Sequence, residues 1–267
     1  METQSYTYPY PHPAVATDCV VLGFDGHELK ILLVQRGVEP FKGLWAFPGG
    51  FLRMDETAEQ CALRELKEET SLDLRYLKQL GAFSEVNRDP RERVISIAFY
   101  ALAKKADAKG GDDAANAQWF SIDEIPHLAF DHDYILRKAM KKIREDIHFE
   151  PIGFDLLDEQ FTMPELQRLY EAILGVHFDR RNFYKKMLQT GILEEVSFAD
   201  EASPTEYYGA HREMKSMSID ALFGDPHTSA PSRPVADDSR RRKGTRFRFN
   251  QKRYEEYKEM HNFRLEF

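Results

Sequence analysis

The most constraining stretch of the chain is residues 57–70, where the spacing of apolar residues predicts a helix that begins shortly after Pro48-Gly49-Gly50. At about 100° per residue, its three glutamates lie within about 120° of one another, on the arc of the small apolar residues. Carboxylates on the inward side of a helix suffer desolvation and mutual repulsion unless a cation lies among them. The pattern therefore disfavours a simple solvated face. The glutamates are Glu65, Glu68 and Glu69, and the small residues are Cys61 and Ala62.

Either of two kinds of cation would compensate the charge of these carboxylates, and the helical periodicity does not decide between them. Mg²⁺ prefers carboxylate and water oxygens and often keeps positions open for a substrate phosphate. Arg64, beside the acidic arc, would instead neutralise part of the charge and make an ion-paired structural helix.

The residues around this helix resemble the Nudix box. Gly50 is followed after five residues by Glu56, and after seven more by the run RELKEETSL at residues 64–72. Every defining position matches except Ser71, where the family has glycine. Such a fixed pattern over 23 residues is a specific signal.

The resemblance implies a fold, a cofactor and an activity. Glu65, Glu68 and Glu69 would hold a divalent metal, Mg²⁺ or Mn²⁺, with one glutamate as catalytic base, while Glu56 and Arg64 brace the loop and helix. Family members use water to cleave a pyrophosphate linkage in nucleoside diphosphate derivatives, and metal ions screen the phosphates and activate the water. A residue with a Cβ at position 71 costs about 1 kcal/mol if the left-handed conformation is kept. Together with the helix-turn-helix pattern at residues 162–189, that departure favours a retained site that mainly binds a ligand, and leaves hydrolysis as the alternative.

The first 150 residues predict an α/β domain with a mixed sheet, and the resemblance implies an α/β/α sandwich. Residues 14–24 and 29–36 are β-branched and leucine-rich strands around the turn residues Asp25-Gly26. Further strands are expected at 81–86, 94–103 and 117–120, and a second helix at 134–147.

Residues 151–267 predict a winged helix-turn-helix domain. Thr162 and Glu165 form a capping box for a helix that Gly175 ends, and Asp179 caps a second helix from 180 to about 189. Residues 192–196 and 245–249 read as a hairpin, with a final helix at about 252–260. A polar insert at about 198–240 is expected to be mobile, with a short helix at 216–223 as one alternative.

Three more stretches, EPFKGLWAFPGGF, RDPRERVISIAFYAL and LAFDHDYIL, look like the Nudix branch that handles ADP-ribose and related metabolites. Guanidinium groups bind phosphate bidentately, so the candidate phosphate contacts are Arg36, Arg88 and Arg91. Phe51 or Phe130 would stack on a base, unless they are core residues. His132 would line the pocket, or else pack as a capping histidine.

The whole arrangement is similar to Nudix-related transcriptional regulators, which join a sensing Nudix domain to a winged helix. That resemblance implies double-stranded DNA as partner and a homodimer, because two half-sites need two recognition helices. The alternative is that the basic residues only solvate the surface. The candidate DNA contacts are Arg180, Arg181, Asn182, Tyr184 and Lys185 on the second helix, and Arg246 and Arg248 on the wing.

The charge of the chain is distributed unevenly. Residues 240–267 carry ten Lys or Arg and four Glu, a balance of +6 in a chain whose total is −8, which leaves −14 for the rest. This asymmetry predicts either a basic surface for a polyanion or a solvated tail. We also expect no signal peptide, no membrane segment, free buried thiols at Cys19 and Cys61, and a cytoplasmic location.

Two functional hypotheses follow. The first is a DNA-binding regulator whose Nudix domain senses a small metabolite, such as ADP-ribose or a sugar. The second is a magnesium-dependent pyrophosphohydrolase of ADP-ribose or a related compound, whose C-terminal domain serves contact with another protein.

Overall fold

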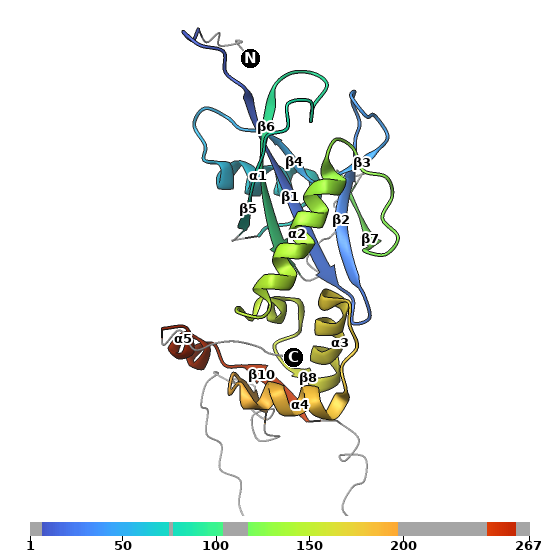
Figure 1. Cartoon of the computed structure of the whole chain (residues 1–267), viewed down its shortest axis with the longest axis vertical. Coiled ribbons are helices and arrows are strands. Elements are labelled where there is room, and N and C mark those ends of the chain that lie inside the picture. Colours follow the sequence, from blue (N-terminus) through green and yellow to red (C-terminus); the bar gives the residue numbers. More distant parts are fainter. Residues whose placement is uncertain (1–6, 75–76, 104–116, 197–244, 260–267) are drawn as a thin grey trace, which may run out of the picture.

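The computed structural model describes residues 7–74, 77–103, 117–196 and 245–259, and shows a layered N-terminal part joined to a smaller helical C-terminal part (Figure 1). The predicted insert at 198–240, with the short helix expected inside it, lies outside the described residues. Among the described helices, none has the length and apolar character needed to cross a bilayer.

A seven-stranded mixed sheet forms the centre of the N-terminal part. Its middle strand β1 (Ala14–Phe24) runs parallel to β6 (Val94–Leu102) and antiparallel to β2 (Leu29–Gln35). The register of β1 with β2 confirms the predicted hairpin around Asp25-Gly26. The remaining strands are β3 (Trp45–Ala46), β4 (Gly49–Phe51), β5 (Lys78–Phe83) and β7 (Ala117–Ser121).

Two helices cover the two faces of this sheet, which confirms the α/β/α sandwich (Figure 1). Because side chains alternate along a strand, Cys19 and Val21 of β1 pack against α1 (Ala58–Thr70), whereas Val20 and Leu22 pack on the side of α2 (His132–Asp146). All four side chains are fully buried. Strand β1 is therefore apolar on both faces, as a central strand between two helical layers must be.

The first helix ends where the sequence predicted, at the one residue that departs from the box. Ser71 caps α1 in the left-handed region at φ 59°, and its N–H donates to the carbonyl of Lys67 at 2.9 Å. The substitution has kept the glycine conformation and left the helix end in place. Strain of about 1 kcal/mol is the expected consequence of a Cβ in this conformation.

The C-terminal part has the predicted winged helix arrangement. Thr162 and Glu165 form the capping box of α3 (Met163–Leu174), and Asp179 accepts from the N–H of Asn182 at the start of α4 (Arg180–Gln189). The described elements that complete it are η2 (Ile152–Leu156), β8 (Phe161–Thr162), β9 (Leu193–Glu195), β10 (Arg246–Phe249) and α5 (Gln251–Glu259), with strand order β8-β10-β9.

The two parts share one hydrophobic cluster at their junction. Ile143 and Ile147 at the end of α2 belong to the same cluster as Leu169 and Ile173 of α3. Arg168 adds a polar contact across the junction, since its Nε donates to the carbonyl of Gly26 at 2.9 Å. The winged helix is thus packed directly against the layered part, and our boundary near residue 150 stays a prediction.

Candidate functional site

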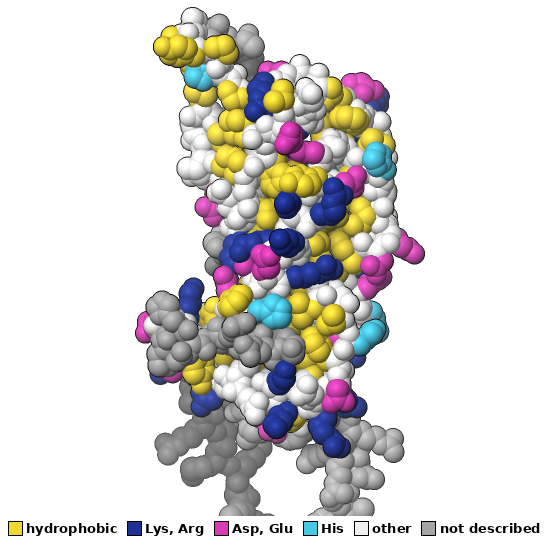
Figure 2. Space-filling model, viewed as in Figure 1, with side chains coloured by type: hydrophobic (Ala, Val, Ile, Leu, Met, Phe, Trp, Pro, Cys, Tyr) yellow, Lys and Arg dark blue, Asp and Glu magenta, His cyan; other side chains and the backbone are white. Residues whose placement is uncertain are grey.

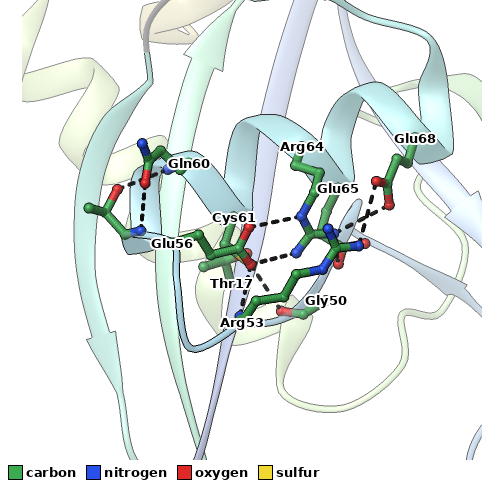
Figure 3. A network of polar contacts seen from close by, with 10 residues as sticks. Thr17, Gly50, Arg53, Glu56, Gln60, Cys61, Arg64, Glu65 and Glu68 are labelled. Carbon is green, nitrogen blue, oxygen red and sulfur yellow. Dashed lines mark hydrogen bonds and ion pairs between the residues drawn. The ribbon is translucent and has the colours of Figure 1, made fainter. Parts of the chain in front are cut away.

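Arg64 organises the polar residues at one side of α1 (Figure 3). Its Nε and Nη2 bind the two carboxylate oxygens of Glu56 at 2.9 and 2.6 Å, a bidentate geometry. Its Nη1 reaches Glu65 at 2.7 Å and Glu68 at 3.3 Å. The hydrogen bonds from Arg64 lower the pKa of Glu56 to about 2. The expected bracing of the loop by Glu56 and Arg64 is therefore present.

The three box glutamates occupy different environments. Glu65 is largely buried, Glu69 is half-buried and accepts from the N–H of Gly49 at 2.9 Å, but 53% of the Glu68 side chain is exposed. Glu68 also lies 3.8 Å from Arg53. The inward arc predicted from periodicity is right for Glu65 and Glu69 and wrong for Glu68, which lies at the outer end of that arc, about 60° around the helix from Glu65.

The charge around Glu69 fits a cation. Burial, together with the nearby carboxylates of Glu65 and Asp18, raises the pKa of Glu69 to about 7 despite the Gly49 hydrogen bond. A Cβ at Gly50 would lie 2.3 Å from the carboxylate of Glu65, so glycine is what lets that carboxylate approach the loop. Oxygen donors of this type suit a hard divalent ion.

The described residues nevertheless contain no group of three or more His, Cys, Asp or Glu side chains arranged to hold a metal ion. Arg64 instead engages two of the box carboxylates, Glu65 and Glu68. The donor chemistry fits the metal, but a site made of all three box glutamates would need both Glu65 and Glu68 to turn from Arg64 toward Glu69.

A pocket of about 180 Å³ lies beside the box, and all six predicted ligand residues line it. They come from the residue after β2, from β4, from the loop before β6, and from the start of α2 and the loop just before it, so the fold brings together positions spread over nearly a hundred residues. The six are Arg36, Phe51, Arg88, Arg91, Phe130 and His132.

Two guanidinium groups and two aromatic rings form the mouth of this pocket. Arg36 lies 4.7 Å from the ring centre of Phe130, and Arg91 lies 5.2 Å from that of Phe51. Burial and the like charge of Arg91 lower the pKa of Arg36 from its usual range. An anionic ligand would relieve this repulsion, and the rings offer faces for a planar group.

Phe41, which the sequence analysis did not single out, faces Phe130 with ring centres 4.9 Å apart. Both residues adopt positive φ, 65° and 55°, which is uncommon for bulky side chains. Such conformations persist where the surroundings over-determine them, commonly at binding sites.

Arg88 and His132 line the pocket but use their polar atoms elsewhere. Arg88, only 4% exposed in its side chain, binds Asp131 at 2.7 Å and Asp18 at 3.3 Å. His132 accepts from the N–H of Phe47 through Nδ1, and its Nε2 lies 3.3 Å from Asp18. Arg88 and His132 thus line the pocket as predicted and also hold its wall together through Asp18, while their contacts to a ligand stay a prediction.

Asp18 is the centre of that network and was missed by the sequence analysis. Although burial raises its pKa, His132, Arg88 and the hydroxyl of Ser96 together lower the pKa of Asp18 to about 2. The available signal was a single carboxylate inside the apolar strand AVATDCVVLGF. A charged residue there requires buried partners.

The predicted DNA-contacting residues of α4 all face solvent. Arg180, Arg181, Asn182, Tyr184 and Lys185 are exposed, while Phe183 and Met187 turn inward to the core. Neither arginine nor Lys185 forms an ion pair with any acid in the described ranges. On the wing, Arg246 donates to the carbonyl of Gln160, and Arg248 pairs with Glu194 at 2.8 Å, so both have structural partners as well.

Two family models match the chain, one for each of its two parts. One family model, the NUDIX domain, matches residues 12–142, and another, the NrtR DNA-binding winged helix domain, matches residues 153–208. The ADPR responsive transcriptional repressor NtrR of Acinetobacter baylyi is 33% identical over 192 residues, which cover 70% of this chain and 77% of the relative. The chain belongs to the Nudix family. Within it, the second match assigns the chain to the branch with an NrtR winged helix.

Two further proteins are similar to this Nudix protein, one over about half of the chain and one over about two thirds of it. The ADP-ribose pyrophosphatase of Methanocaldococcus jannaschii is 44% identical over 132 residues, 49% of this chain and 76% of the relative. The crystal structure of Shewanella oneidensis NrtR complexed with a 27mer DNA matches with a TM-score of 0.61 at 30% identity, and covers 68% of this chain and 85% of that chain. The predicted fold class is confirmed.

Proposed function

We propose that this protein is a transcriptional repressor that binds double-stranded DNA through its winged helix and responds to ADP-ribose bound in its Nudix domain. The observation that carries this proposal is the match to an ADP-ribose-responsive repressor across both parts of the chain. The pocket beside the box supplies the matching chemistry, because Arg36 presents positive charge next to the ring of Phe130, and Arg91, paired with Asp89 at 2.7 Å, lies over that of Phe51.

The proposed DNA surface is the exposed side of α4, with the wing beside it. Arg180, Arg181 and Lys185 project from one helix that follows α3 after a short turn, the geometry of a recognition helix in the major groove. The similarity to an NrtR crystallised with DNA supports this assignment. We further propose a homodimer acting in the cytoplasm, since paired half-sites need two copies of α4.

The proposal is tested by titrating promoter fragments into the full chain at fixed salt, with and without ADP-ribose, and following fluorescence anisotropy. We expect a sequence-dependent affinity that ADP-ribose changes. Arg36→Gln should require about tenfold more ADP-ribose for the same response, because a charge-assisted contact is lost. Arg93→Gln, outside the pocket, is the matched control. Lack of any sequence preference, or of any ADP-ribose effect, would refute the proposal.

A second candidate function is hydrolysis of ADP-ribose, favoured by the presence of Glu65, Glu68 and Glu69 and by the match to a pyrophosphatase. Mg²⁺ or Mn²⁺ would supply charge neutralisation of the phosphates. In this case the glutamates hold the ion, while Glu56 keeps Arg64 in place. The measurement is AMP release with and without EDTA: metal-dependent turnover lost in Glu68→Gln would establish it, and absence of turnover with ADP-ribose would exclude it.

A further inference from the structure

A second pocket, of about 660 Å³, lies at the junction of the two parts of the molecule. It shares no lining residue with the pocket beside the box. Its walls come from the β1–β2 turn, the loop after β7, the middle and end of α2, and the end of α3 with the residues that follow it. Its size falls within the range of small-molecule sites, which occur preferentially at domain interfaces.

Three arginines line this junction pocket. Arg137 and Arg144 come from α2 and Arg168 comes from α3. All three side chains are exposed, and Lys and Arg side chains gather over α2 on the face shown in Figure 2. Arg144 donates through Nε to the carbonyl of Ile173, and Arg168 donates through Nε to that of Gly26. These two bonds fix the planes of both guanidinium groups at the pocket wall.

The acids that line the same pocket do not neutralise these arginines. Glu28 is bound by Lys30 and by the hydroxyl of Ser121. Glu171 accepts from the N–H of Phe178 at 2.8 Å and from Gln167 at 3.0 Å.

The arginines form no ion pair with acids in the described part of the chain. Lys30 offsets Glu28, whereas Asp123 and Glu171 have no Lys or Arg partner there, so the three arginines exceed these two carboxylates by one positive charge. This balance favours an anion.

The rest of the lining is apolar. Leu29, Leu136 and Met140 are buried and form the floor, and Ile122, Ile125 and Ala172 extend it. A ligand that fits must therefore present an oxyanion to the guanidinium groups and an apolar body to the floor.

We propose that this junction pocket is a ligand site, separate from the Nudix pocket, for a small organic oxyanion, either a phosphate ester or a carboxylate with an apolar body. Since Arg137 belongs to the layered part and Arg168 to the winged helix, one such ligand contacts both parts at once. Its binding would favour the arrangement of the two parts described above.

The test is isothermal titration of the full chain with phenyl phosphate, benzoate and inorganic phosphate at fixed salt. We expect phenyl phosphate or benzoate to bind with one molecule per chain, and the stronger of the two identifies the head group. Inorganic phosphate should bind more weakly, because it lacks the apolar body. Absence of binding by both organic probes at millimolar concentration would overturn the proposal.

Three variants locate the probe. Arg137→Gln should weaken binding about tenfold, since one charge-assisted contact is lost. Lys141→Gln removes the same charge from the same helix, but its side chain lies outside this pocket and should leave the affinity unchanged. Arg36→Gln lies in the Nudix pocket and should also leave the probe affinity unchanged. If Lys141→Gln or Arg36→Gln weakens probe binding as much as Arg137→Gln does, the assignment to the junction pocket is overturned. This outcome does not depend on whether ADP-ribose changes DNA binding.

Discussion

Replacing Asp18 by asparagine should reveal how much the buried network beneath the Nudix pocket contributes to stability. Asparagine has nearly the same shape, so the substitution removes the charge without opening a cavity. Arg88, 4% exposed, would then face one carboxylate, Asp131, instead of two, and Ser96 and His132 would lose an ionised acceptor. Removing one partner of a buried ion pair is destabilising because the other charge stays buried.

The magnitude follows from the pKa of Asp18, which is lowered from its ordinary value of 3.8 to about 2. A difference of this size, at about 1.36 kcal/mol per pKa unit, corresponds to about 2.4 kcal/mol. Because the folded-state pKa is depressed, this stability is present above pH 3.8 and is lost as the pH falls through about 2. By pH 3, about 1 kcal/mol of it should be gone.

The assay is urea denaturation of the wild type and Asp18→Asn at pH 7 and pH 3. We expect Asp18→Asn to lower the free energy of unfolding by about 2 to 3 kcal/mol at pH 7, and by about 1 kcal/mol less at pH 3. Asp73→Asn removes an exposed partner of Lys67 and should change stability by less than about 1 kcal/mol. A deficit of Asp18→Asn that is the same at both pH values would refute the reasoning.

Three further substitutions probe other parts of the molecule. Ser71→Gly should raise the free energy of unfolding by up to about 1 kcal/mol, because φ 59° suits glycine; unchanged stability in urea would mean that the cap is unstrained. Thr162→Ala should lower it by about 1 kcal/mol through loss of the capping box, whereas Thr162→Ser should have little effect in the same assay. Lys185→Ala should weaken DNA binding equally for all sequences and reduce the salt dependence by about one ion; an unchanged slope would rule out a phosphate contact.

The sequence predicted the local structure well because local structure follows short-range rules. The capping box of Thr162 and Glu165, Asp179 at the start of α4 and Gly175 at the end of α3 are decided by groups a few residues apart. The box pattern then brought Glu56 and Arg64 together, a contact that spans eight residues and needs only the loop before α1.

The roles of individual site residues were harder to predict, since long-range contacts decide them. Arg88 was expected to hold a phosphate, and the structure shows it bound to Asp131 and to Asp18, seventy residues earlier, which no short-range pattern indicated. Glu68 was expected to face inward, yet more than half of its side chain is exposed. A helical wheel gives the direction of a side chain and not what packs against it.

The sequence by itself determined the elements, their caps and the family motif, because these depend on residue types at fixed short spacings. The tertiary structure alone decided which charges are exposed and which are buried, how Asp18, Arg88 and His132 share one network, and that three arginines of α2 and α3 meet at the junction pocket. Desolvation and ion pairing depend on what packs around a group, and that is set by segments far apart in the chain.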